Sequence, residues 1–136
     1  MHSSSSDAKY NVLVVDDNES VTEVLTIMLS RRGCRCESAT NGIEAMQKVK
    51  QSNFDAVITD LQMPEMDGIV LMKELSHHFP DLPVMIMTGQ PDDSLVESAI
   101  SAGARELLRK PFEISELMTR LHKMLHIHES TGEQVA

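Results

Sequence analysis

The stretch that decides the fold is FDAVITDLQMPEMDG, residues 54–68. Residues 56–59 are apolar or β-branched at consecutive positions, which is typical of a strand buried on both faces of a parallel sheet. The strand ends in Asp60, and open parallel α/β sheets bind their ligands at the carboxyl edge of the strands. The stretch therefore predicts a central strand that delivers Asp60 to a functional edge, with Pro64 and Gly68 closing the loop that follows.

The composition indicates one acidic domain. The chain has 136 residues, of which 41% are hydrophobic, and its formal net charge is -9. This length suits a single compact domain. The negative charge argues against binding of nucleic acid by this domain alone, because a sequence-independent grip on phosphates requires clustered lysine and arginine. The sequence has neither an apolar run long enough to cross a membrane nor an apolar signal segment, so we expect a cytoplasmic protein with no membrane partner.

The rest of the chain repeats a strand followed by a helix. Apolar strands are predicted at residues 12–15 and 82–87, and strands of mixed character at residues 34–39 and 106–109. Apolar residues in the segments between them recur every three or four positions, as in amphipathic helices. This spacing predicts that the helices turn inward Val21, Val24, Leu25, Met28 and Leu29, then Ile43, Met46 and Val49, then Ile69, Met72 and Leu75, then Leu95, Val96, Ala99 and Ile100, and finally Ile114, Leu117, Met118, Leu121 and Leu125.

Polar residues mark where these helices begin. Asn18 is placed to cap the first helix, and Asn41 with Glu44 resembles a capping box at the second. Asp67 is placed to cap the third helix, and Asp92 or Asp93 to start the fourth. The sequence therefore predicts helix starts close to the carboxyl ends of the strands.

Five strands alternating with five helices predict a parallel sheet with right-handed crossovers and helices on both faces. The most apolar strands belong in the middle of such a sheet and the mixed ones at its edges. We therefore predict an α/β fold: a five-stranded parallel sheet of order 2-1-3-4-5 in a flavodoxin-like three-layer (βα)5 sandwich. The domain is expected at residues 10–127, between a disordered or tag-like tail at 1–9 and a polar tail or linker start at 128–136.

The predicted strand order gathers polar residues at the carboxyl edge. Asp16 and Asp17 follow the first strand, Asp60 ends the third and Thr88 the fourth, and Lys110 follows the fifth. Lys110 lies about two strand spacings, or about 10 Å, from Asp60, a gap that its long side chain can cross. Three clustered carboxylates repel each other, which favours proton uptake or a bound divalent cation, and oxygen ligands favour Mg²⁺. A carboxylate beside Mg²⁺ can attack phosphorus to form an aspartyl phosphate, while Thr88 and Lys110 meet the charge on the transferred oxygens.

These motifs together resemble the receiver domain of bacterial two-component response regulators. The resemblance rests on the acidic pair after the first strand, the segment DLQMPEMDG, Thr88 after the fourth strand and the Lys-Pro-Phe sequence at 110–112. It covers residues 10–127. It departs from the family at Leu107, three residues before Lys110, where the family usually has tyrosine or phenylalanine.

The resemblance implies specific roles at the site. Asp60 is expected to be the phosphoacceptor, and Asp17 and the main-chain carbonyl of Gln62 direct Mg²⁺ ligands, with Asp16 acting mainly through metal-bound water. Thr88 and Lys110 are expected to bind the phosphoryl oxygens. The resemblance also implies that the peptide bond between Lys110 and the following proline is cis.

By the same resemblance the protein is a phosphorylation-controlled signalling switch. We expect it to accept a phosphoryl group from a sensor histidine kinase or phosphotransfer protein, and to be no enzyme beyond its own phosphorylation and dephosphorylation. An output domain or protein partner is expected to use the fourth helix, fifth strand and fifth helix. A phosphorylation-dependent dimer is a separate expectation. One alternative is a receiver that docks or dimerises without phosphorylation. The other is a Mg²⁺-dependent aspartyl-phosphate hydrolase, which usually has a second aspartate where this chain has Gln62.

Overall fold

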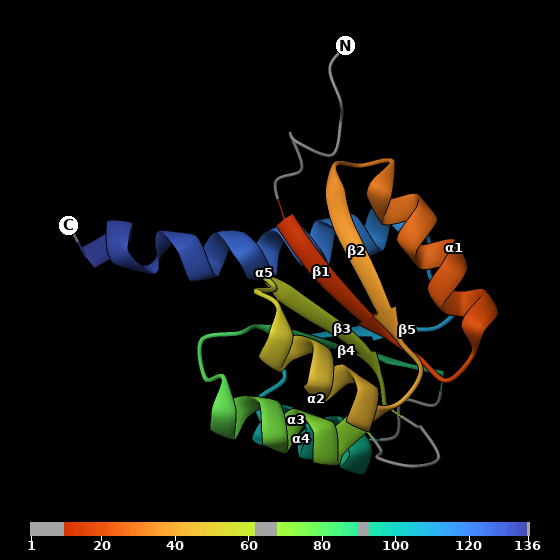
Figure 1. The fold of residues 1–136 in the computed structure, drawn as a ribbon. Coiled ribbons are helices and arrows are strands. Elements are labelled where there is room, and N and C mark those ends of the chain that lie inside the picture. Colours follow the sequence, from red (N-terminus) through yellow and green to blue (C-terminus); the bar gives the residue numbers. More distant parts are fainter. Residues whose placement is uncertain (1–9, 62–67, 90–92, 136) are drawn as a thin grey trace.

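Strands and helices alternate along the whole described chain (Figure 1). This computed structural model describes the backbone of residues 10–61, 68–89 and 93–135, and the side chains of 10–61, 68–89 and 94–125. The strands are β1 (Tyr10–Val15), β2 (Cys34–Ala39), β3 (Ala56–Asp60), β4 (Val84–Thr88) and β5 (Glu106–Arg109). The helices are α1 (Glu19–Ser30), α2 (Gly42–Gln51), α3 (Gly68–His78), α4 (Asp93–Ser101) and α5 (Ile114–Val135). The predicted series of elements is confirmed.

All strand pairs are parallel, and the sheet has the order β2-β1-β3-β4-β5. The predicted order and fold class are confirmed. Every residue of β3 and β4 is buried, whereas β2 and β5 alternate between buried and more exposed positions. The most apolar strands occupy the centre because only there are both faces of a strand covered.

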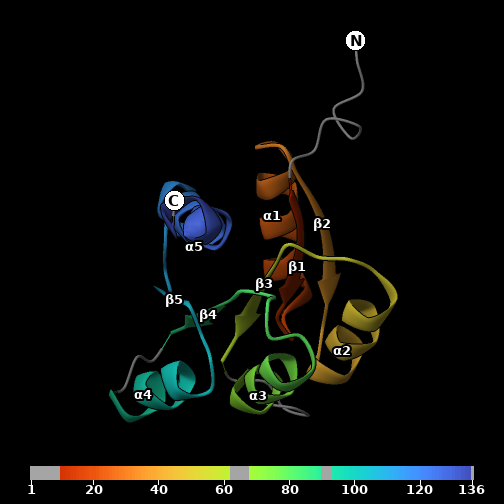
Figure 2. The ribbon, with the colours of Figure 1, turned by 90° about the vertical axis from the view of Figure 1, so that its left-hand side faces the viewer.

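Helices cover both faces of the sheet (Figure 2), with α1 and α5 on one side and α2, α3 and α4 on the other. Each side has its own core. Leu25 and Leu29 of α1 pack with Leu117 and Leu121 of α5 in one cluster. The other cluster contains buried residues of α2, α3 and α4. The sheet thus separates two cores, as expected of a three-layer sandwich.

The prediction that the apolar helix residues face inward is wrong at three positions. Val24, Ile43 and Ile100 have exposed fractions of 53%, 52% and 59%. Each helix contacts the flat sheet along a narrow stripe, and Val24 lies about 100° around its helix from the buried Leu25. Thr22 takes the buried position on α1 instead. The prediction from apolar spacing therefore overestimated the width of the buried stripe on these helices.

The caps of α1 and α2 are confirmed, with one difference. The Asn18 side chain accepts from the N–H groups of Ser20 and Val21, and that of Asn41 accepts from Glu44 N–H at 2.8 Å. In a capping box the Glu44 carboxylate would accept from the Asn41 N–H, but here it accepts from the N–H of the preceding residue, Thr40, at 2.8 Å. The predicted caps at Asp67 and Asp92 lie outside the described residues.

Helix α5 extends further than the sequence suggests. The polar segment after residue 127 was expected to be a tail, but α5 is helical through Val135, and Figure 1 shows its C-terminal end running past the sheet. Extending an existing helix costs less than nucleating a new one, so helix can continue where apolar spacing has stopped. The domain boundary at residue 127 stays a prediction. Among the described residues, no helix has both the length and the apolar content to span a membrane.

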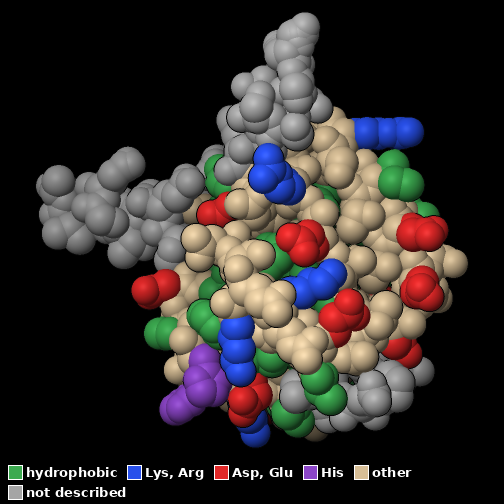
Figure 3. Space-filling model, viewed as in Figure 1, with side chains coloured by type: hydrophobic (Ala, Val, Ile, Leu, Met, Phe, Trp, Pro, Cys, Tyr) green, Lys and Arg blue, Asp and Glu red, His purple; other side chains and the backbone are tan. Residues whose placement is uncertain are grey.

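The surface mixes charges of both signs. Acidic and basic side chains are interspersed on the face shown in Figure 3. Lys48 illustrates their spacing, since its Nζ lies 3.9 Å from Glu37 and 3.8 Å from Glu44. Exposed ion pairs of this kind contribute at most about 1 kcal/mol each. Stability therefore rests mainly on the two apolar cores.

Candidate functional site

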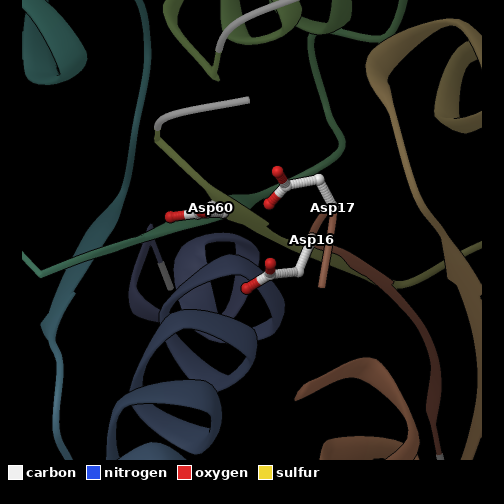
Figure 4. A group of neighbouring side chains, drawn as sticks. All are labelled: Asp16, Asp17 and Asp60. Carbon is white, nitrogen blue, oxygen red and sulfur yellow. The ribbon is translucent and has the colours of Figure 1, made fainter. Parts of the chain in front are cut away.

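Three carboxylates meet at the carboxyl edge of the sheet (Figure 4). Asp16 and Asp17 directly follow β1, and Asp60 is the last residue of β3, the strand beside it. One oxygen atom of each carboxylate lies within 4.8 Å of the others. Asp16 and Asp60 are 1% and 9% exposed, whereas Asp17 is exposed. The predicted acidic cluster is therefore present, with two members buried and one facing solvent.

Lys110 reaches this cluster from the far side of β4. Its Nζ lies 3.0 Å from Asp16 Oδ2, to which it donates a hydrogen bond, and 3.6 Å from Asp60 Oδ1. Partial burial lowers the pKa of Lys110, but the hydrogen bond to Asp16 and the negative charges of Asp60 and Asp16 outweigh this effect and raise the pKa above its ordinary value. The side chain is therefore a cation at neutral pH. The contact with Asp60 was predicted, and the closer contact with Asp16 was not.

Asp16 is held at both carboxylate oxygens. While Oδ2 accepts from Lys110, Oδ1 accepts from the Asn18 N–H at 2.9 Å. Asn18 is also the N-cap of α1, so the same few residues fix the start of the helix and the orientation of the carboxylate. Asp17 is exposed beside it, which leaves Asp17 the more accessible of the pair.

Thr88 lies at the same edge, at the end of β4. It is 1% exposed, and its carbonyl oxygen accepts from the Lys110 N–H at 2.8 Å. The preceding residue, Met87, is the register partner of Asp60. Strand β4 therefore links the phosphoacceptor candidate on one side to the lysine on the other.

Two residues near the cluster in sequence, Pro111 and Gln62, were also predicted to have special roles. The peptide bond between Lys110 and Pro111 is cis, as the resemblance implies. Gln62, the expected main-chain ligand, lies outside the described residues.

The donor set fits a hard divalent cation. Three carboxylates lie together beside the Lys110 ammonium group, so these four side chains carry excess negative charge in a partly buried place. Carboxylate oxygens suit Mg²⁺, which keeps several waters and needs only a partial protein site. A cation at this edge would offset the excess charge.

Sequence reasoning missed an apolar groove next to the cluster. A cavity of 640 Å³ lies between α1 and the segment that joins β5 to α5. Lys110, the residue that contacts Asp60, lines it together with Ser20. The apolar part of its lining consists of Val21, Val24, Leu25, Met28, Pro111, Phe112 and Ile114. The exposed Val24 was the available signal, but its apolar character was assigned to the core.

Comparison with known proteins identifies the family. Residues 12–122 match the family model of the response regulator receiver domain. The chain belongs to this family. The receiver domain is 37% identical over 115 residues to the transcriptional regulatory protein ZraR of Klebsiella oxytoca, a match that covers 85% of this chain and 26% of ZraR. It is 36% identical over 114 residues to the response regulator MprA of Mycobacterium sp. (strain KMS), covering 84% of this chain and 50% of MprA.

The fold of the receiver domain is also found in solved structures. The chemotaxis protein CheY4 of Vibrio cholerae superimposes with a TM-score of 0.83 at 29% identity, covering 87% of this chain and all of that one. The receiver domain spans only about a quarter of ZraR and half of MprA.

Leu107 stands where the resemblance leads us to expect an aromatic residue. It is partly buried against the core on the α4 side and lines a cavity of 120 Å³ together with Ala99, Ile100 and Ala104. We expect Leu107→Tyr to change the free energy of unfolding by less than about 1 kcal/mol, because this half-open space can take part of the ring. Thermal melts test this expectation.

The neighbouring residue provides the control. Leu108 is completely buried on the opposite face of β5, so Leu108→Tyr should lower the melting temperature strongly. An equally large drop for the two variants would show that Leu107 has no such space.

Proposed function

We propose that this receiver domain is a signalling switch that accepts a phosphoryl group on Asp60 from a sensor histidine kinase or a phosphotransfer protein. The observation that carries the proposal is the position of Asp60 among charged side chains of both signs. Its carboxylate lies near Asp16 and Asp17, with the Lys110 ammonium 3.6 Å away. A nucleophile, an acidic cation site and a fixed positive charge thus occur together at one sheet edge, as phosphoryl transfer requires.

In the proposed reaction a carboxylate oxygen of Asp60 attacks the phosphorus atom of a phosphorylated histidine. The new O–P bond forms as the N–P bond breaks, and the imidazole leaves with the bonding electrons and takes up a proton. Lys110 pairs with the negative phosphoryl oxygens, and the hydroxyl of Thr88 donates to them. Both contacts stabilise charge at the transferred group.

Asp17, Asp60 and the Gln62 carbonyl would hold Mg²⁺ directly, and Asp16 through water. The bound ion would supply neutralisation of charge on the phosphoryl oxygens. The asymmetry within the acidic pair supports this assignment, because Asp16 already has both oxygens engaged whereas Asp17 is exposed.

The apolar groove beside Lys110 supports docking of a protein donor. Its lining is largely apolar, and it adjoins the residue that contacts Asp60. A donor that packs an apolar surface there can place its phosphorylated side chain at the carboxylate cluster. We propose that α4, β5 and α5 contact the output domain or partner.

Labelling by a small phosphodonor tests the proposal. With acetyl phosphate and Mg²⁺ the wild-type protein should gain one base-labile phosphoryl group, and Asp60→Asn should gain none, because the amide is no nucleophile. EDTA should abolish labelling of the wild type. Intact-mass spectra provide the measurement, and a phosphorylated donor protein in place of acetyl phosphate tests the partner.

Asp55→Asn is the matched control. Asp55 precedes the other end of β3 and is exposed, and its carboxylate accepts from the Asn11 N–H at 2.8 Å. This variant should label like the wild type. Equal labelling of Asp60→Asn and wild type, or labelling that survives EDTA, would contradict the proposed roles of Asp60 and its cation.

A further inference from the structure

Gly68 contacts the main chain of the strand that carries Asp60. It is the first residue of α3 and is buried, and its N–H donates to the Leu61 carbonyl oxygen at 2.7 Å. The chain leaves the sheet at Asp60 and Leu61 and returns to the same place at Gly68. The start of α3 therefore packs directly against the end of β3.

Position 68 has no room for a side chain. A Cβ atom there would lie 2.6 Å from the Asp60 carbonyl oxygen, 2.6 Å from Leu61 Cα and 2.8 Å from the Leu61 carbonyl oxygen. All three are main-chain atoms, so no side-chain rotation can relieve the contacts. Gly68 does not have a positive φ, unlike Gly33 and Gly103. Glycine is required here by the close approach of two backbones and not by a special backbone conformation.

A side chain at this position would have to move either α3 or the end of β3. Helix α3 is anchored by Leu71, Met72 and Leu75, which are completely buried in the core. Close-packed interiors resist such shifts. Beyond the strand, Leu61 is held by the hydrogen bond from its N–H to the Met87 carbonyl oxygen at 2.9 Å. The conflict is therefore expected to disturb the main chain at Asp60 and Leu61, where α3 and the end of β3 meet.

We propose that Gly68 is a positioning residue for phosphoryl transfer to Asp60. Its missing Cβ lets α3 press directly on the Asp60 and Leu61 main chain, which fixes the carboxylate relative to Asp17 and Lys110. Misplacing a reacting group by about 1 Å can cost about 100-fold in rate. This inference rests on the proposed function of Asp60 as the phosphoacceptor.

Gly68→Ala tests the inference, with Gly103→Ala as the matched control. Gly103 follows α4 and has a φ of +117°, and a Cβ there would collide with the Ser76 hydroxyl. The control therefore introduces a steric conflict and backbone strain without touching Asp60. Labelling rates with acetyl phosphate and Mg²⁺ are measured at a temperature where far-UV circular dichroism shows all three proteins folded.

We expect Gly68→Ala to label about 10- to 100-fold more slowly than wild type, and Gly103→Ala to stay within about twofold even though it melts at a lower temperature. A second readout is the Mg²⁺ dissociation constant, which sets the Mg²⁺ concentration at which the melting temperature begins to rise. This constant should increase for Gly68→Ala only, because a loss of stability alone does not change the affinity of the folded state for Mg²⁺.

The outcomes separate the two proposals. No labelling of the wild type would overturn the proposed function. If the wild type is labelled, and Gly68→Ala has the same labelling rate and the same Mg²⁺ dissociation constant, only the role of Gly68 is overturned. If Gly68→Ala is unfolded in buffer, the assays are run in an osmolyte that favours the folded state. A variant that stays unfolded even there would also overturn the inference, because Gly68 would then serve folding as a whole.

Discussion

Lys110→Met should lower the free energy of unfolding by about 3 kcal/mol, because it leaves the buried Asp16 carboxylate without its cation. Asp16 Oδ2 lies 3.0 Å from Lys110 Nζ, and Asp60 Oδ1 lies 3.6 Å from it, so one ammonium group is paired with both carboxylates. Methionine keeps the length of the side chain and removes the charge. Thermal melts in EDTA should show a midpoint lower by roughly 10 °C.

Lys123→Met is the control for the loss of an ion pair at the surface. Lys123 lies 3.8 Å from Glu106, and its side chain is 62% exposed. Its removal should cost less than about 1 kcal/mol. Equal losses for the two variants would show that Lys110 acts as an ordinary surface lysine.

The pH dependence of this difference follows from the raised pKa of Lys110. A group whose pKa is raised in the folded state contributes its full stabilisation below the unfolded pKa and loses it as pH rises through the folded pKa. The gap between wild type and Lys110→Met should therefore be constant around neutral pH. It should narrow only at strongly alkaline pH, above the ordinary lysine value of about 10.4.

Asp60→Asn should have the opposite effect and raise the melting temperature in EDTA. With an effective dielectric constant of about 20, unit charges separated by about 4.8 Å repel by about 3.5 kcal/mol, and the attraction across 3.6 Å is about 4.6 kcal/mol. The two repulsions from Asp16 and Asp17 therefore outweigh the attraction to Lys110. Because Asp17 is exposed, solvent weakens its repulsion of Asp60. We therefore expect the free energy of unfolding to rise by about 1 to 2 kcal/mol.

Mg²⁺ should reverse the order of the two proteins. A cation that binds only the folded cluster stabilises wild type by mass action, and much less so the variant that lacks one carboxylate. Melts of both proteins in EDTA and in millimolar Mg²⁺ provide the four midpoints needed. A lower midpoint for Asp60→Asn in EDTA, or an equal gain from Mg²⁺, would show that the three carboxylates do not act as one cation site.

The sequence by itself determined the sheet and the residues at its functional edge. The apolar runs that end in Asp16, Asp60 and Thr88 predict buried parallel strands, and parallel strands bring their carboxyl ends to one edge. Strand order then follows from which runs are apolar enough for the centre. The acidic cluster could be predicted because its members are placed by strand register and not by side-chain packing.

Only the tertiary structure decided which faces and partners these elements use. Val24 and Leu25 are neighbours in an apolar pattern, yet the angle at which α1 meets the sheet buries Leu25 and leaves Val24 lining the groove. Lys110 and Asp16 are 94 residues apart, and their hydrogen bond depends on how a flexible side chain crosses β4. The close contact between Gly68 and the main chain of Asp60 likewise depends on how α3 packs against the sheet. Local sequence determines where the strands lie and which helix positions are apolar. Contacts between distant segments depend on small shifts in how the elements pack, and the spacing of residues along the chain does not specify these shifts.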